Sequence, residues 1–150
     1  MSTKLDQTDW KILGILKDHA EYSTSQIAKK TLLPRTTIHN RIRKLRQEGV
    51  IRKFTVKLDN QRIGKGFVAY VLISANLPLL KAKKRTQADL AAELRRLSFV
   101  ERADIVAGGT DLVAIVRCKD VQEFNEFLLD KLQLVEGIDK TQSLIVIRSR

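Results

Sequence analysis

The chain has 150 residues, of which 43% are hydrophobic and 30% charged, a composition that supports a folded core and argues against disorder. Its longest apolar run, Phe67 to Ile73, is far shorter than the roughly 20 residues that a membrane-spanning helix needs. No secretory signal pattern opens the sequence, and the single cysteine, Cys118, excludes an intrachain disulfide. We therefore expect a cytoplasmic protein of one ordinary domain or two small ones, with no membrane partner.

The net charge of +11 is unevenly distributed. Residues 1–63 hold 14 Lys and Arg against 6 Asp and Glu, whereas residues 64–150 hold 14 against 11. A basic first half suits a polyanionic partner such as nucleic acid. Solubility alone and an acidic membrane surface are the alternatives, but no basic helix here has a broad, aromatic-rich apolar face.

Two helices are predicted near the N-terminus. Apolar residues recur at helical spacing over residues 6–17, which indicates the first helix. Ser23 to Gln26 has the S-x-x-Q form of a capping box, so a second, short helix should run from Thr24 to about Lys30. Residues 31–33 then form a turn, which completes the spacing of a helix-turn-helix.

A third helix and a strand pair follow the turn. Pro34 suits the first helical position, because its missing N–H is not needed there, and the helix should run to Glu48. Gly49 is a natural left-handed stop. Residues 51–58 alternate roughly as a strand and would form a wing, and residues 59–66 should be the linker between two domains.

The second half predicts a sheet domain. Its strands are expected at residues 67–75, 100–106, 112–118 and 141–147, and its helices after Thr86 and after Asp120, each a capping residue. This β-α-β-β-α-β order is the ferredoxin-like arrangement. The fold class is therefore α+β, with a winged helix-turn-helix domain at residues 1–58, a linker at 59–66 and a ferredoxin-like domain at 67–150.

A charged run joins the first strand of this domain to its first helix. It comprises Lys81, Lys83, Lys84 and Arg85. Such runs are most often solvated loops or helix starts, and a contact with DNA or a partner is the alternative.

The third helix carries the candidate DNA-reading surface. At about 100° per residue, Ile38, Ile42 and Leu45 fall on one side and should face the core. The opposite, polar and basic side suits the major groove of B-DNA, where Asn can read adenine and Arg guanine. The candidate contacts on this helix are Arg35, Thr36, Thr37, His39, Asn40, Arg43, Lys44 and Gln47. A merely solvated basic helix is the alternative, and the capped helix and turn before it argue against that.

The predicted wing supplies further cations. Arg52, Lys53 and Lys57 would lie along phosphates, which fix register without reading sequence.

Signals of catalysis are poor. The two histidines, His19 and His39, have no Cys, Asp or Glu at metal-ligand spacing, and Cys118 lies in an apolar predicted strand. No glycine pattern of a nucleotide-binding loop occurs. We therefore predict no catalytic residue, no metal and no cofactor.

The sequence resembles the Lrp/AsnC, or feast/famine, regulators over nearly its whole length. In the first half the resemblance rests on Leu5-Asp6, Asp9, Lys11 to Leu13, Thr37 to Leu45, and Gly49 to Ile51. In the second half it rests on Gly64, on Gly108 to Asp111, which resembles the family's G-x-x-D turn, and on Gly137-Ile138 with Thr141 and Ser143. The sequence departs at Pro34, where members often have Ser, and at the long basic stretch from Lys81 to Arg85.

The resemblance implies a DNA-binding homodimer or higher homo-oligomer that binds an amino acid effector near the glycine turn, between subunits. The residues that it implicates are Gly108, Gly109, Thr110, Asp111, Thr141 and Ser143. Backbone N–H groups of the two glycines would suit a carboxylate, Asp111 would pair with the α-ammonium, and the two hydroxyls would assist. A plain hairpin turn, with Asp111 as a turn residue, is the alternative.

The sequence therefore indicates a transcriptional regulator tuned by an amino acid. Two other functions remain open. An accessory regulator would bind ligand and dock on other regulators without an operator of its own, and it would not need a complete basic reading helix. A haem-pathway decarboxylase on the same fold would need active-site histidines or arginines in its sheet domain, and residues 64–150 contain no histidine.

Overall fold

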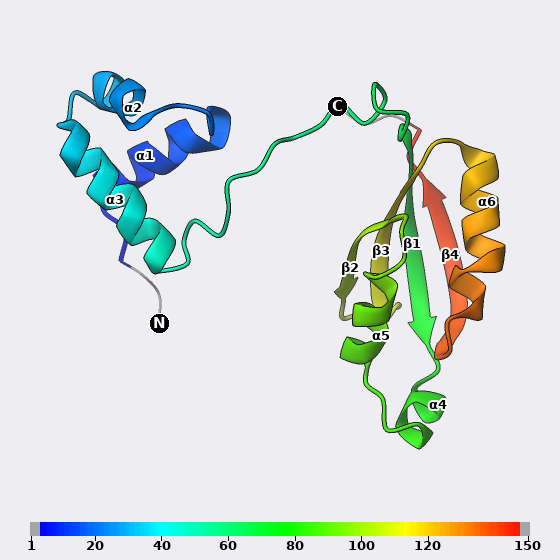
Figure 1. Ribbon diagram of the computed structural model, residues 1–150. Coiled ribbons are helices and arrows are strands. Elements are labelled where there is room, and N and C mark those ends of the chain that lie inside the picture. The colour runs from blue at the N-terminus through cyan, green and yellow to red at the C-terminus, as the bar shows by residue number, and fades with distance from the viewer. Residues whose placement is uncertain (1–3, 148–150) are drawn as a thin grey trace. The chain divides into compact units, whose positions relative to one another are not determined.

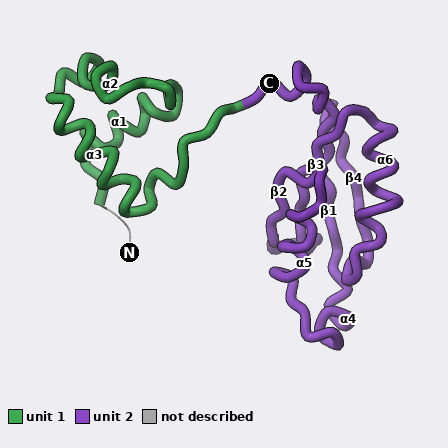
Figure 2. Tube along the Cα trace, in the orientation of Figure 1, with its two compact units in different colours: residues 1–57 green, residues 58–150 purple. Residues whose placement is uncertain are grey.

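The computed structural model describes residues 4–147 and divides into two compact units, residues 1–57 and 58–150 (Figure 2). The first unit holds three helices, α1 (Gln7–Asp18), α2 (Thr24–Thr31) and α3 (Arg35–Gln47). The second holds a four-stranded sheet and its helices (Figure 1). No helix in residues 4–147 is both long enough and apolar enough to cross a membrane.

Local caps set the helices of the first unit. Asp6 and Asp9 form a capping box at α1, and Ser23 and Gln26 form the predicted one at α2. The third helix begins one residue later than predicted, because Pro34 has an extended ψ of 141° and is the N-cap rather than the first helical residue. Beyond the far end of α3, Gly49 has φ +72°, which confirms the predicted left-handed stop.

A small apolar core holds the three helices together. Ile12, Ile27 and Ile38 are fully buried, one from each helix, and Leu16 is 8% exposed. Ile38 and Leu45 (1% exposed) fix the inner side of α3, as the helical spacing predicted. The opposite side of α3 is thereby held toward solvent.

The predicted strand over residues 51–58 is wrong: no strand forms in residues 50–66. The alternating side chains Phe54, Val56 and Leu58 are 46%, 76% and 55% exposed. A strand requires a neighbour to receive its backbone hydrogen bonds, and the described chain offers none to this segment. Alternation alone was therefore insufficient to make a wing in this chain.

The second unit has the predicted β-α-β-β-α-β order. Its strands β1 (Phe67–Ala75), β2 (Val100–Ile105), β3 (Leu112–Cys118) and β4 (Ile138–Ile145) are all antiparallel, in the order β2-β3-β1-β4. Its helices are α4 (Leu77–Ala82), α5 (Gln87–Leu94) and α6 (Val121–Asp130), followed by a 3-10 turn at Leu132–Leu134. The last strand begins at Ile138, not at Thr141, and α4 is an addition to the predicted pattern.

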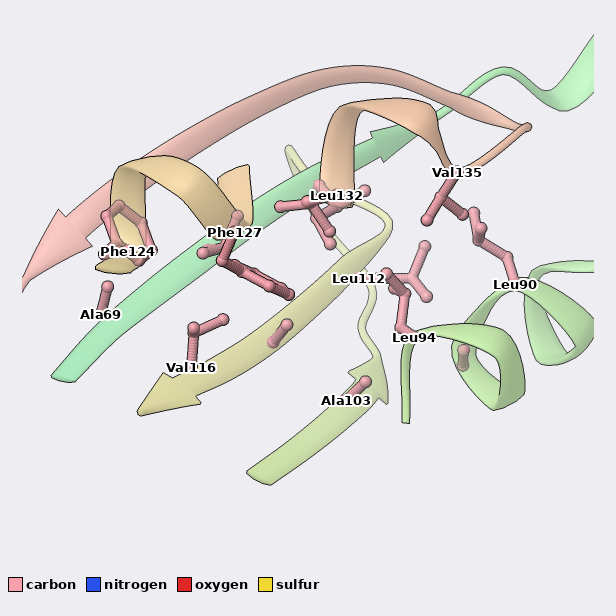
Figure 3. Close-up of a cluster of buried hydrophobic side chains, with 14 of the residues drawn as sticks. Ala69, Leu90, Leu94, Ala103, Leu112, Val116, Phe124, Phe127, Leu132 and Val135 are labelled. Atoms are coloured by element: carbon pink, nitrogen blue, oxygen red, sulfur yellow. The ribbon is translucent and has the colours of Figure 1, made fainter. Parts of the chain in front are cut away.

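One face of the sheet packs against α5 and α6 to form the core (Figure 3). Thr86 with Asp89 forms the predicted capping box of α5, and the Asp120 carboxylate accepts the N–H of Glu123 at the start of α6. Figure 3 shows Leu94 from α5 and Phe124 and Phe127 from α6 beside side chains of the strands, and Leu90 from α5 beside Val135. The two leucines and the two phenylalanines are at most 3% exposed.

The other face of the sheet is more open. Because side chains alternate along β1, Val71 and Ile73 enter the core, and Tyr70, Leu72 and Ser74 lie on the opposite face. The register of β4 places residues 144, 142 and 140 opposite these three, so their side chains share that face. Tyr70 is 42% exposed. This open face positions the candidate ligand pocket.

The charged run of the sequence is partly a helix and partly paired. It spans the end of α4 and the turn that follows, where Lys84 has φ +54°. The Lys83 ammonium lies 3.2 Å from a carboxylate oxygen of Glu136, and Arg85 pairs with Glu93. Two of its four cations are therefore neutralised within the sheet domain.

Candidate nucleic-acid interface and ligand pocket

The outer side of α3 is polar, basic and exposed. Of the eight residues predicted on this helix, seven are exposed, and Thr37 is half-buried. At the end of this surface the carboxylate of Glu48 lies 3.9 Å from the ammonium of Lys44. Such a surface presents hydrogen-bond donors and positive charge together, which is what the edges and phosphates of a DNA groove accept.

Two shallow concave surfaces flank α3 and gather most of the predicted DNA-contact residues. One is lined by Thr24, His39, Ile42, Arg43, Arg46, Gln47, Ile51 and Arg52. The other is lined by Thr24, Arg35, Thr36, His39 and Asn40. The Nε of Arg35 donates to Thr24 Oγ1 at 3.2 Å, which ties the start of α3 to the start of α2. Thr24 and Arg46 are additions that helical spacing alone did not single out.

The cations after Gly49 are divided by the structure. Arg52 lines the surface beside α3 and also a second groove with Trp10 and Leu13 of α1, whereas Lys53 lines only that second groove. Lys57 is exposed and lines neither surface beside α3. The Arg46 guanidinium lies 6.0 Å from the ring centroid of Phe54, a cation–π contact between α3 and this segment.

An ion-pair cluster fixes α3 against α1. The Arg41 guanidinium donates to Asp9 Oδ1 at 3.0 Å and to Asp6, and Asp9 is only 2% exposed. The hydrogen bond from Arg41 lowers the pKa of Asp6, with help from the Asp9 backbone N–H, and the two carboxylates raise the pKa of Arg41. Arg41 is thus a positioning residue, which its place in the α3 sequence did not reveal.

The sheet domain carries a pocket on its open face, between the ends of β1 and β4 and the glycine turn. It is lined by Leu72, Ser74, Gly109, Thr110, Lys140, Thr141 and Gln142. Three of the six residues implicated by the family resemblance, Gly109, Thr110 and Thr141, therefore meet there. Gly108, Asp111 and Ser143 do not line it, and Ser143 lies opposite Val71, on the register that faces the helices.

The structure places Asp111 in a structural role. Its Oδ2 accepts the Ala75 N–H at 2.8 Å, and its Oδ1 accepts the Gln87 side-chain amide at 2.8 Å. The hydroxyl of Thr110 donates to the Ile73 carbonyl at 2.8 Å. These bonds hold the glycine turn against β1 and α5, so the carboxylate that was expected to meet an ammonium is already used by the chain itself.

Nothing in the described residues suggests a metal centre. No group of three or more His, Cys, Asp or Glu side chains in residues 4–147 is placed to hold an ion. Cys118 is fully buried in β3, and burial, with smaller effects of Glu123 and Asp120, raises the pKa of its thiol to about 11. The thiol is therefore a core group rather than a nucleophile.

A helix-turn-helix with an exposed basic third helix, followed by a separate sheet domain with a polar pocket, defines a transcriptional regulator with a ligand-binding domain. Two family models support this class. One, described as winged helix-turn-helix DNA-binding, matches residues 5–52, and the other, the Lrp/AsnC ligand binding domain, matches residues 69–150. The chain belongs to the Lrp/AsnC family of regulators.

Individual relatives agree over almost the full length. The HTH-type transcriptional regulator FL11 of Pyrococcus horikoshii is 33% identical over 149 residues, which cover 99% of this chain and 93% of FL11. The structure of the regulator NMB0573 from Neisseria meningitidis in complex with L-Met has a TM-score of 0.87 at 25% identity, covering 97% of this chain and 91% of that one. AsnC of E. coli has a TM-score of 0.85 at 24% identity, covering 98% and 95%, and shares the fold.

Proposed function

We propose that this protein binds a specific double-stranded DNA sequence as a homodimer or higher homo-oligomer, and that an amino acid bound in the sheet domain modulates this binding. The observation that carries the proposal is the exposed side of α3. Asn40, Arg43 and Gln47 lie there, solvent-accessible, on a helix whose other side is anchored by Ile38 and Leu45.

The side chains of this surface fall into two groups, those suited to reading bases and those suited to contacting phosphates. Asn40 has the geometry to read adenine through two hydrogen bonds, and Arg43 has the planar fork that reads guanine. Arg35, at the helix start, and Arg52, beside the far end of α3, suit phosphates. Base contacts would set the operator sequence, and phosphate contacts would set the register.

The apolar side chains on the open face of the sheet support the oligomeric part of the proposal. Tyr70 and Leu144 lie opposite each other in the register and are 42% and 45% exposed. Leu72, Val113 and Ile115 are half-buried on the same face. A contiguous apolar face of this kind is a typical protein interface, and a second copy of the chain is the proposed occupant.

The pocket on the open face is the proposed effector site. Its Gly109 and Thr110 belong to the turn that the family resemblance implicates, and Ser74, Thr141 and Gln142 add polar groups. The related Neisseria regulator has been crystallised with L-Met, which supports an amino acid as the ligand class here. The identity of the amino acid stays open.

The test is selection of binding sites from random double-stranded DNA by the full-length protein, with and without pooled amino acids. We expect a reproducible sequence, bound more tightly than random DNA, and a change of affinity or assembly with some amino acids. The variant Asn40→Ala is the control and should lose sequence enrichment while staying folded. Failure to enrich any sequence under either condition would refute operator binding and favour the accessory-regulator alternative.

A further inference from the structure

The charge among the residues that line the candidate effector pocket is positive. Lys140 is exposed on β4, opposite Ser74 of β1, and is the one charged residue among those that line the pocket. Within residues 4–147 its ammonium makes no ion pair with a carboxylate. A free cation at the rim of a polar pocket favours an anionic group of the ligand.

The glycine turn adds hydrogen-bond donors that also favour an anionic group of the ligand. The backbone N–H groups of Gly109 and Thr110 donate to no protein acceptor in the described chain, although both residues line the pocket. Gly108, just before these two residues, has φ +146°, a conformation that L side chains rarely adopt. Unpaired amides and an ammonium together make a site for a carboxylate.

The acids near the pocket are engaged or lie outside its lining. Both oxygens of Asp111 accept hydrogen bonds from Ala75 and Gln87, and turning either outward would leave a donor unpaired. Asp104 of β2 does not line the pocket, and its Oδ2 lies 2.5 Å from the Nε of Arg102. Asp139 is next to Lys140 in the chain but does not line the pocket. Within residues 4–147, no unengaged carboxylate therefore lines the pocket to meet an ammonium.

We infer that the pocket recognises its ligand through the carboxylate, which Lys140 and the Gly109 and Thr110 amides bind, and that no charge within residues 4–147 reads the amine. The ligand class then extends from an amino acid to the 2-oxo acid with the same side chain. This inference rests on the proposed function, because it assumes that the pocket is the effector site. It differs from the pairing of an ammonium with Asp111 that the family resemblance implies, because both oxygens of that carboxylate accept hydrogen bonds within the chain.

The experiment compares three forms of one ligand on the full-length protein by calorimetry. The standard L-amino acids are titrated first, and for each that binds, its carboxamide and its 2-oxo acid follow, with L-methionine, L-methioninamide and the 2-oxo acid of methionine as the first set. We expect the oxo acid to bind within about threefold of the amino acid, and the carboxamide about tenfold or more weaker, because it loses the charge-assisted bonds.

Variants separate the role of Lys140 from a general charge effect. Lys140→Met should weaken the amino acid and the oxo acid alike by about tenfold, and Lys140→Arg should restore most of the affinity. Lys81→Met, which removes an exposed cation of α4 outside the pocket, is the matched control and should change neither. Circular dichroism checks that each variant is folded.

The outcomes distinguish the inference about carboxylate recognition from the proposal that an amino acid is the effector. An oxo acid that binds more than about tenfold weaker than the amino acid, with a carboxamide that still binds, would overturn the inference, because an acid of a second copy would then be reading the amine. Binding of 2-oxo acids without any amino acid would refute the amino acid effector but keep the inference. Binding of neither class would overturn both, and a Lys140→Met variant with unchanged affinity would remove Lys140 from the site.

Discussion

Replacing Arg43 tests whether α3 reads bases. This side chain is exposed on the outer side of α3 and makes no ion pair within residues 4–147, so its guanidinium fork is free for DNA. A bidentate contact with guanine discriminates against other bases by about 1–3 kcal/mol, which corresponds to roughly five- to 150-fold in affinity. Arg43→Ala should weaken operator binding by this amount and leave random DNA much less affected.

Two further substitutions show whether the loss of affinity comes from base reading, from charge or from a loosened helix. Arg43→Lys keeps the charge but not the planar fork, so it should lose sequence preference while retaining most of the non-specific affinity. Arg41→Leu is the matched control on the same helix: its guanidinium binds Asp6 and Asp9, so its loss should loosen α3 and lower the melting temperature. Because Arg43 is exposed, its own substitution should change stability by no more than about 0.5 kcal/mol.

The assay is fluorescence anisotropy with the selected operator and with random DNA, over a range of salt concentrations. Equal losses of Arg43→Ala on both DNAs, with a shallower salt dependence, would mean that Arg43 contacts a phosphate. Unchanged affinity on both would place this part of α3 outside the groove. Either result would refute the assignment of base reading to the outer side of α3.

Three other perturbations test the cation at Lys57, the Asp6–Arg41 pair and the packing of Gly137. Lys57→Ala should weaken operator and random DNA alike and reduce the salt slope by about one if its ammonium contacts a phosphate, and an unchanged slope in a salt titration would remove Lys57 from the interface. The pKa of Asp6 is lowered by Arg41, so the pair stabilises the first unit above the unfolded pKa of aspartate, and that stability is lost as the pH falls through the lower folded value. The stability difference between wild type and Arg41→Leu, measured by denaturant unfolding, should therefore shrink in acid, and a constant difference would contradict this. Gly137→Ala should destabilise the sheet domain by about 2–4 kcal/mol, because the added Cβ would lie 2.6 Å from Leu80 Cδ2 and because residue 137 has φ +107°. An unchanged unfolding midpoint would contradict this and show that Leu80 and α4 shift without measurable cost.

Local signals account for what the sequence predicted well. The capping pairs at Ser23 and Thr86 and the stop at Gly49 depend on residues within one turn of each other, so their chemistry is readable in order along the chain. The inward positions Ile38 and Leu45 follow from the 3.6-residue period alone. The βαββαβ order followed from the same two kinds of pattern, capped helices and apolar strands.

Features that depend on a contact with a residue far away in the sequence could not be predicted from local patterns. Alternation over residues 51–58 describes which side chains share a face, but the described chain offers this segment no neighbouring strand. Arg41 looked like one more cation of α3, and only the fold brings it to a carboxylate 32 positions earlier. Asp111 looked free for a ligand, because the sequence does not show that Ala75 and Gln87 come within hydrogen-bond distance of it.

The position of the pocket suggests how a ligand would act on DNA binding. An effector shifts an equilibrium only by its differential affinity for the two states, so it must contact something that differs between them. Leu72 lines the pocket and also belongs to the open face with Tyr70, where we place the second copy. A ligand held by Lys140 would therefore touch the association surface directly. To reverse an assembly equilibrium from 1:99 to 99:1 it must bind one state about 10⁴-fold more tightly, which is more than one surface cation supplies. We therefore expect graded changes in assembly with ligand concentration, through several contacts at the same face, rather than an all-or-none switch set by Lys140 alone.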